Sequence, residues 1–415
     1  MRRLSKSSSN KLSADSQRMV SVAQGLAQAA SRVEERNWEH SLDSLILKAL
    51  KGAHQETIDA ALEHLFRTDL NAYDALMESV EAGSESCVVE HEGVQYQALL
   101  IAAPILAWTR FSIASGTIAE DMRTTLMAHL HGHLLASDTR LAMAPTLFAI
   151  DQLPRTHAET YTLTQRMAQA AIKGSPMRAL NNAPETAPFL ADTRYLLAAV
   201  AAPVGAPLFT WQATMNTADR SLALAQWRAQ AMPNIASLLP GCGVELLMPE
   251  AYYVACREAD KHIRPASIRA AVHFLTHTLG VEATGLRAII GGFSEDNVED
   301  RVDEYRIGFT LRQNPEVIYG VVWPLYGRED EEEPAATSFE ALTTPEVLDT
   351  EMRTPLEEIV ALLRACGITH IKRHTELFPM EFCDDCGAPL YPDPDAELVH
   401  AEMPEDAPTG TGHFH

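Results

Sequence analysis

Two cysteines near the C-terminus provide the most recognisable chemistry in this sequence. Cys383 and Cys386 are separated by two residues and followed by Gly387, within the segment Cys-Asp-Asp-Cys-Gly-Ala-Pro. A turn of this length brings two thiolates to one point, where a tetrahedral Zn²⁺ can bind them. His400 and His413 follow at spacings that suit a site of two cysteines and two histidines. We therefore expect these four side chains to hold a structural Zn²⁺.

Two aspects of this cysteine pair remain open at the level of sequence. His415, His374 or Cys366 could replace His413 as the fourth ligand. The pair could also be reduced and free of metal, or it could act as a redox dithiol. A redox dithiol favours the start of a helix, where the helix dipole lowers the thiol pKa. Here Pro389 follows in a stretch that reads as extended, which disfavours the redox interpretation.

Three closely spaced histidines form a second candidate site. On a helix, His129 and His133 share a face at a spacing of four residues and could chelate one metal, while His131 points away. The intervening residues lack the Glu of the hydrolytic HExxH pattern. A simpler interpretation is a helix C-terminus at which imidazoles meet carbonyl oxygens and the negative end of the dipole.

The negative charge of the chain is concentrated in two segments. The net charge is -23; residues 328–351 contain nine acidic residues and one Arg, and residues 376–415 contain ten acidic residues without Lys or Arg. Such segments repel phosphate backbones, so we do not expect nucleic acid as a partner. Their simplest role is to form solvated surface.

The composition favours a folded protein in a reducing compartment. The six cysteines are scattered rather than arranged as a disulfide framework, so we expect a cytoplasmic protein. Apolar runs are shorter than the roughly 18 residues needed to span a bilayer, so no membrane association is expected. Residues 1–14 are basic and rich in Ser without the apolar region of a secretory signal, and we expect a flexible arm there.

Periodicity divides the remaining chain into three regions. Residues 15–83 show the spacing of four helices, with Gly52 and Gly83 at two of the helix ends. Residues 84–376 alternate strands and helices, and we expect residues 377–415 to form an acidic tail that binds zinc. We therefore expect an α/β or α+β fold with a helical N-terminal layer, a mixed-sheet body and a small C-terminal tail resembling a zinc knuckle.

The body contains the same order of elements three times: two strands, a helix and a closing strand. Thr117 with Glu120, and Thr354 with Glu357, form capping boxes at two of the expected helix starts. In the second unit, the expected second strand is 207–211. Internal duplication and chance are both compatible with this order. The three ββαβ units lie near 86–149, 194–248 and 304–373.

Several segments resemble a known family. They are Trp-Glu at 38–39, Asp-Thr-Arg-Tyr-Leu-Leu at 192–197, Glu-Tyr-Arg-Ile-Gly-Phe-Thr-Leu at 304–311, Val-Val-Trp-Pro-Leu at 321–325, Phe-Pro-Met-Glu-Phe-Cys-Asp-Asp-Cys-Gly-Ala-Pro-Leu at 378–390 and His-Ala-Glu-Met-Pro-Glu at 400–405. Along most of its length, the chain resembles a bacterial family catalogued as a domain of unknown function and found mainly in betaproteobacteria. The resemblance implies a bacterial cytosolic protein and supplies no activity.

These observations favour a non-enzymatic binding or adaptor protein, with a protein or a small molecule as its partner and a structural Zn²⁺ in its tail. The alternative is an enzyme with a pocket in the α/β body, assisted by a metal at His129 and His133.

Overall fold

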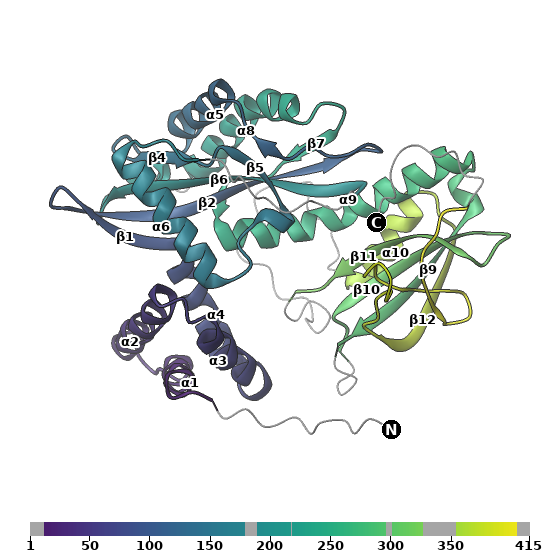
Figure 1. Cartoon of the computed structure of the whole chain (residues 1–415), viewed down its shortest axis with the longest axis horizontal. Coiled ribbons are helices and arrows are strands. Elements are labelled where there is room, and N and C mark those ends of the chain that lie inside the picture. The colour runs from purple at the N-terminus through teal and green to yellow at the C-terminus, as the bar shows by residue number, and fades with distance from the viewer. Residues whose placement is uncertain (1–11, 179–188, 217, 296–300, 327–353, 405–415) are drawn as a thin grey trace.

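The computed structural model describes residues 12–178, 189–216, 218–295, 301–326 and 354–404. Figure 1 shows three parts in chain order: four helices, a first β-sheet with helices on both faces, and a second, smaller β-sheet. The fold class predicted from the sequence is confirmed. Most of the arm expected at residues 1–14 lies outside the described residues. Within the described ranges, no helix is both long and apolar enough to cross a membrane.

Four helices form the N-terminal layer. Ser31 and Asp69 cap two of them by accepting hydrogen bonds from N–H groups of the first turn. Their apolar faces share one core, which also contains Tyr161 from the next part of the chain, so the layer is packed onto the body. The helices are α1 (Ala14–Ala27), α2 (Arg32–Lys51), α3 (Gln55–Thr68) and α4 (Leu70–Glu85).

The first sheet is antiparallel and is centred on two long strands, β2 and β6. β6 is buried at every position from Asp192 to Ala202, and its many alanines allow helices to pack closely on both faces. The strand order is β1-β2-β6-β5-β3, with β4 also pairing with β6, and β7 and β8 pairing with β2. The strands are β1 (Ser86–His91), β2 (Val94–Trp108), β3 (Gly116–Thr117), β4 (Arg140–Met143), β5 (Thr146–Ala149), β6 (Ala191–Pro203), β7 (Gly243–Leu246) and β8 (Glu250–Ala251).

Two split βαβ units, β2-α5-β4 and β6-α8-β7, interleave in this sheet. Their helices, α5 (Glu120–His133) and α8 (Ala218–Leu238), cover one face and pack on each other. α6 (His157–Lys173) and the first half of α9 (Tyr252–Leu279) cover the opposite face. Short helical turns at η1 (Ile150–Gln152) and η2 (Ala283–Gly285), together with α7 (Thr210–Thr214), complete the connections.

The second sheet has the order β11-β10-β9-β12. β12 runs parallel to β9, while the other neighbouring pairs are antiparallel, so the sheet is mixed. α10 and the second half of α9 cover one face. The elements are β9 (Leu286–Ser294), β10 (Glu304–Leu311), β11 (Val317–Pro324), α10 (Pro355–Ala365) and β12 (His370–Pro379), and a two-stranded hairpin of β13 (Tyr391–Pro392) and β14 (Leu398–Val399).

α9 connects the two sheets, as Figure 1 shows. Tyr252, Ala255 and Ala259 in its first half pack against the first sheet. Ile268 and Leu275 in its second half are buried under the second sheet. One helix therefore supplies part of both hydrophobic cores.

Three details differ from the sequence predictions. The strand expected at 207–211 is wrong, because Gln212 accepts hydrogen bonds from the N–H groups of residues 208 and 209 and starts α7 instead. The capping box expected for Thr117 is also wrong. α5 begins directly at Glu120, whose carboxylate pairs with Arg123. α4 continues past Gly83 and ends at Glu85.

The two units expected near 86–149 and 304–373 differ in their strand pairing. The described elements are β1-β2-β3-α5-β4-β5 in the first and β10, β11, α10 and β12 in the second. In the first unit, one strand (β6) separates β2 from β4, whereas two strands separate β11 from β12. The capping box of Thr354 and Glu357 is confirmed at the start of α10.

Candidate metal centre

Cys383 and Cys386 lie in a tight turn directly after β12. The N–H of Cys383 donates to the carbonyl of Ala388 at 2.7 Å, and the N–H of Gly387 donates back to the carbonyl of Cys383 at 2.8 Å. Gly387 has a φ of +73°, a conformation that costs little only for glycine. The residue types in Cys-Asp-Asp-Cys-Gly thus fold locally into a knuckle that turns both sulfur atoms to the same side.

His400 is brought to the knuckle by the hairpin of β13 and β14. The carboxylate of Asp393 accepts hydrogen bonds from the N–H groups of Asp395 and Glu397, both at 2.8 Å, and fixes the hairpin turn. β14 ends at Val399, so His400 leaves the hairpin next to the cysteines. Two separate turns therefore supply the sulfur and nitrogen donors.

The donor atoms of Cys383, Cys386 and His400 all lie within 4.8 Å of one another. The Sγ of Cys386 is 3.2 Å from Nε2 of His400. In a tetrahedral zinc site, bond lengths near 2.3 Å to sulfur and 2.0 Å to nitrogen separate these two atoms by about 3.5 Å. A shift of a few tenths of an ångström would therefore make room for an ion. This group could hold a metal ion.

The second ring nitrogen of His400 has a carboxylate beside it. Nδ1 is buried, forms no hydrogen bond among the described residues and lies 3.4 Å from Oε1 of Glu402. Histidine ligands commonly direct their free N–H toward a carboxylate, which fixes the ring and makes the ligand nitrogen more basic. The ring of His400 is therefore oriented with Nε2 toward the sulfur atoms and Nδ1 toward Glu402.

Backbone dipoles favour the thiolate form of Cys383. The N–H groups of Cys386 and Asp385 point at its sulfur and lower the pKa of the Cys383 thiol. Since the thiolate is the form that binds metal, the turn prepares this side chain for a cation.

Arg306 fixes the knuckle to the second sheet. Its guanidinium is fully buried, and Nη1 donates to the carbonyls of Glu381 and Leu390, each at 2.7 Å. These two carbonyls lie on the two arms of the knuckle. Nε donates to the carboxylate of Glu304 at 2.6 Å, so the buried charge is paired.

Two aromatic rings complete the surroundings of this guanidinium. Its carbon lies 4.3 Å from the ring centre of Phe293 and 5.0 Å from that of Phe382. Phe293 comes from the sheet and Phe382 from the knuckle. Arg306 thereby joins the knuckle to the sheet through hydrogen bonds and ring contacts together.

Glycines in the strands leave room for the C-terminal segment. A Cβ at Gly320 would overlap the ring of Tyr391, and one at Gly308 would lie 2.9 Å from the carbonyl oxygen of Pro392. A Cβ at Gly291 would lie 2.8 Å from the Phe378 ring. The face of the second sheet opposite α9 and α10 is therefore bare enough for the segment to lie directly on the strands.

The structure brings three of the four expected ligands together. His413 and its alternative His415 lie outside the described residues. The other two alternatives are outside the group: Nε2 of His374 is 2.9 Å from the carbonyl oxygen of Asp393, and Cys366 is the C-terminal cap of α10. The described residues thus leave the fourth position of a tetrahedral ion to another donor.

The histidines of α5 take a different arrangement. Nε2 of His129 is 3.0 Å from the side-chain amide of Asn234 on α8. His133 ends the helix, as expected for imidazoles near carbonyl oxygens. In the described part of the chain, the cysteine and histidine group above is the one set of three or more potential ligands that meets in space, and it does not include His129 or His133.

Two contributors to the centre were missed from the sequence. Arg306 lies within an otherwise apolar strand, on the same side as Glu304 and Gly308 because side chains alternate. The sequence signal that could have revealed it is Glu304, Arg306 and Gly308 at alternate positions of an expected strand. Glu402, two residues after His400, carried no signal of its own.

We compared the chain with known proteins. A model of the family described as "Protein of unknown function (DUF2863)" matches residues 4–414. The chain belongs to this family. The DUF2863 match extends over both sheets and over the three clustered ligands, so it covers the candidate centre and the body that supports it. Neither the curated proteins nor the solved structures gave a match.

Proposed function

We propose that the clustered thiolates and imidazole bind one Zn²⁺ as a structural clip, with His413 as the fourth ligand. Sulfur and imidazole donors in a tetrahedral arrangement favour zinc over calcium or magnesium, which prefer oxygen. The main support for this proposal is that Cys383, Cys386 and His400 converge from two turns that are each fixed to the second sheet.

A structural role is supported by the surroundings of the proposed ion. The knuckle is joined to the sheet by Arg306, and the chain beyond His400 continues along the sheet, where the N–H of Glu402 donates to the carbonyl of Val317 at 3.0 Å. A hollow elsewhere in the described structure is lined by other residues, in the first sheet and α6. The ion would therefore hold chain segments in place rather than meet a substrate.

We propose further that the protein is a cytoplasmic binding or adaptor protein. The clip leaves Asp384, Asp385 and the ring of Phe382 exposed at the surface, which supports a contact surface at the knuckle. All six cysteines are free thiols, which suits a reducing compartment.

Metal analysis of untagged protein tests the clip. We expect about one zinc per chain in the wild type and none in Cys383→Ser or His400→Ala. Cys242→Ser, a free cysteine of the first part of the body, is the matched control and should keep the metal. Wild-type protein without a transition metal, or equal loss in the control, would overturn the proposal.

Cobalt substitution separates a structural site from a catalytic one. Co²⁺ in a closed set of four protein ligands should give a tetrahedral spectrum that added imidazole does not change. His413→Gln should open one position and make the spectrum respond to imidazole, whereas His415→Gln should not. A wild-type spectrum that shifts with imidazole would contradict the structural role.

Capture from native extract tests the adaptor role. Wild-type protein should retain a partner that is lost with Cys383→Ser and with the double change Asp384→Lys and Asp385→Lys, while Cys242→Ser retains it. If the wild type and all three variants retain the same proteins, the knuckle is not the contact surface.

A further inference from the structure

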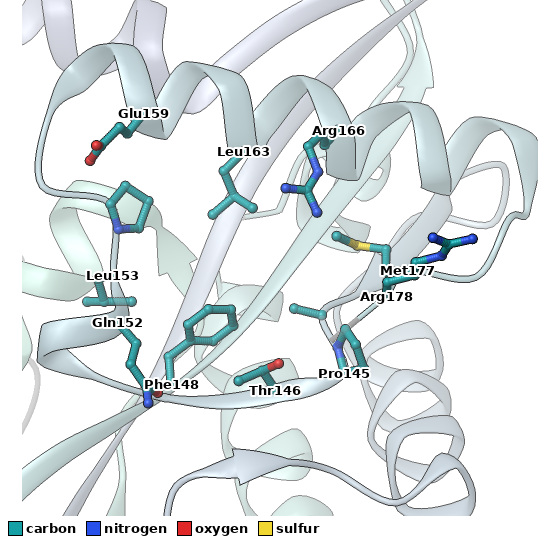
Figure 2. Close-up of a pocket in the computed structure, with 12 residues that line it drawn as sticks. Pro145, Thr146, Phe148, Gln152, Leu153, Glu159, Leu163, Arg166, Met177 and Arg178 are labelled. Carbon is teal, nitrogen blue, oxygen red and sulfur yellow. The ribbon is translucent and has the colours of Figure 1, made fainter. Parts of the chain in front are cut away.

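A hollow of about 230 Å³ lies between α6 and the segment that leads into β5. Figure 2 shows Phe148, Leu153 and Leu163 forming much of its wall, with Met177 closing one side. Sites for drug-sized ligands typically measure about 300–1,000 Å³. A space of this size and lining therefore fits a small organic molecule with an apolar body.

Two arginines, Arg166 and Arg178, line this hollow. Figure 2 shows the guanidinium of Arg166 directed from α6 into the space beside Leu163 and Met177. Arg166 forms no ion pair and no hydrogen bond with any other residue that the structure describes. A guanidinium presents parallel N–H donors whose geometry matches a carboxylate. The hollow therefore has an available anchor for one negative charge.

The hydroxyl of Thr146 provides a second polar contact. Thr146 is only 4% exposed and lines the same hollow. Its hydroxyl has no hydrogen-bond partner among the described residues. A ligand oxygen at this position can accept a hydrogen bond from this hydroxyl.

Glu159 and Gln152, two further polar residues of the hollow, are engaged in local structure. The carboxylate of Glu159 accepts the N–H of Arg155 at 2.8 Å, and the side-chain oxygen of Gln152 accepts the N–H of Ala149 at 3.0 Å. Figure 2 shows Glu159 on the opposite side from Arg178, so the charges of the rim are separated along the hollow. A ligand with one charged end and one apolar end matches this arrangement.

We propose that this hollow binds a small monocarboxylate with a compact hydrocarbon or aromatic body. The carboxylate pairs with Arg166 and accepts a hydrogen bond from Thr146, and the body packs against Phe148, Leu163 and Met177. This site is separate from the metal centre, so it does not depend on the zinc proposal.

Methyl NMR of the full chain tests this proposal directly. With ¹³C-labelled methionine, the Met177 methyl signal, assigned by Met177→Leu, should shift saturably when phenylacetate or hexanoate is added. Phenylacetamide has nearly the same shape without the charge and should bind at least about tenfold more weakly. Absence of a saturable shift at millimolar carboxylate, or equal binding of the amide, would overturn the proposal.

Matched variants identify the anchor. Arg166→Gln should weaken phenylacetate binding about tenfold to a hundredfold, and Thr146→Val should weaken it several-fold. Lys173→Gln removes a positive charge from the same helix outside the hollow and should leave binding within about twofold of wild type. Equal weakening by Lys173→Gln and Arg166→Gln would indicate nonspecific attraction and contradict the assignment. Circular dichroism of each variant verifies that the fold is retained.

Discussion

Arg306 joins both arms of the candidate metal centre to the second sheet. A charge with no exposed surface is tolerated only when it is paired and its hydrogen-bond donors are used. Glu304 supplies the negative charge, while the two knuckle carbonyls accept from Nη1. The same side chain therefore satisfies its own burial and sets the separation of the two arms that carry Cys383 and Cys386.

Replacement of Arg306 should affect metal affinity and stability together. Arg306→Gln leaves the half-buried Glu304 without its partner, so we expect a loss of about 3 kcal/mol in the free energy of unfolding. Because the arms lose their common anchor, metal affinity should fall about 10- to 100-fold. Urea unfolding and competition with a chromophoric chelator measure the two effects.

Arg312→Gln is the matched control for this prediction. Arg312 follows the same strand and is exposed, so its removal should change the unfolding free energy by less than about 0.5 kcal/mol. Metal affinity in Arg306→Gln equal to that of the control would show that the knuckle holds its shape without this anchor.

The close contact between Gly320 and Tyr391 leads to a second prediction. Gly320→Ala places a methyl group where the Tyr391 ring lies, and overpacking of this kind costs about 1–3 kcal/mol. The denaturant midpoint should fall accordingly. Gly132→Ala is the control, because its helical position has open space and the change should be neutral or stabilising. A stability for Gly320→Ala at or above that of wild type would mean that the hairpin can move aside at little cost.

Single residues also show what sequence alone can reveal of the site. The spacing of Cys383 and Cys386 predicted the knuckle, because its geometry is local. The position of His400 relative to the sulfurs depends on a hairpin and on a sheet built from distant strands. For the same reason the contacts of Arg306 could not be read from the chain. Its partners lie roughly 75–85 residues farther along the sequence.

At the scale of elements, a buried carboxylate joins the helical layer to the long helix. Glu85 ends α4, and its carboxylate accepts the N–H of Tyr253 in the first turn of α9 at 2.9 Å. Burial is the main cause that raises its pKa from 4.5 to about 7, and Glu81 adds to this while the hydrogen bond and Arg257 oppose it. The contact between these two helices should therefore respond to pH.

The sign of this response follows from the raised pKa. The folded protein holds a proton on Glu85 that the unfolded chain releases near pH 4.5. The stabilisation of the folded protein by this bound proton is therefore complete below pH 4.5 and is lost as the pH rises through about 7. The change from 4.5 to about 7 corresponds to roughly 3 kcal/mol. Glu85→Gln keeps an acceptor for Tyr253 without a charge and should remove this part of the pH dependence.

Urea unfolding at pH 5 and pH 8 measures the effect. Wild-type protein should lose about 2.5 kcal/mol more than Glu85→Gln between these two values. Glu78→Gln, an exposed position on the same helix, should behave like wild type. Identical pH dependence in all three proteins would show that Glu85 does not titrate in this range.

Helices and strands with strong local signals were predictable, whereas weakly signalled ones were not. α10 follows directly from Thr354, Pro355 and Glu357, which form a capping box and a proline start in the structure. α7 escaped prediction because a single side chain, Gln212, caps the preceding backbone and overrides the strand-like composition of 207–211. A hydrogen bond from one side chain to nearby backbone leaves no periodic pattern in the sequence.

For the whole molecule, the proposed ion belongs to the second sheet alone. Chelation should raise hydrogen exchange in residues 380–403, which lie on the glycine-bearing face, because binding energy at such sites is folding energy. β2 and β6 should exchange as before, since their core is built from other residues. Hydrogen-exchange mass spectrometry with and without chelator, and with Cys383→Ser, measures this. Uniform loosening of both sheets would contradict the assignment.

The assembly of the three parts was the least predictable feature. The sequence indicated helices first and alternating strands later, which was enough for the fold class. It did not indicate that α9 would supply both cores, because its apolar positions look alike along its length. Which sheet each half covers is decided by strands far away in sequence.

The parallel pairing of β9 with β12 has a consequence for biogenesis. Arg287 pairs with His370, so an emerging chain presents β9 and its glycines long before β12 is available. Pairing across such a separation is slow, and an open strand edge can recruit other chains during that interval. Aggregation of nascent protein should therefore begin at β9, and a chaperone that shields this edge should raise the yield more than one that acts on the first sheet.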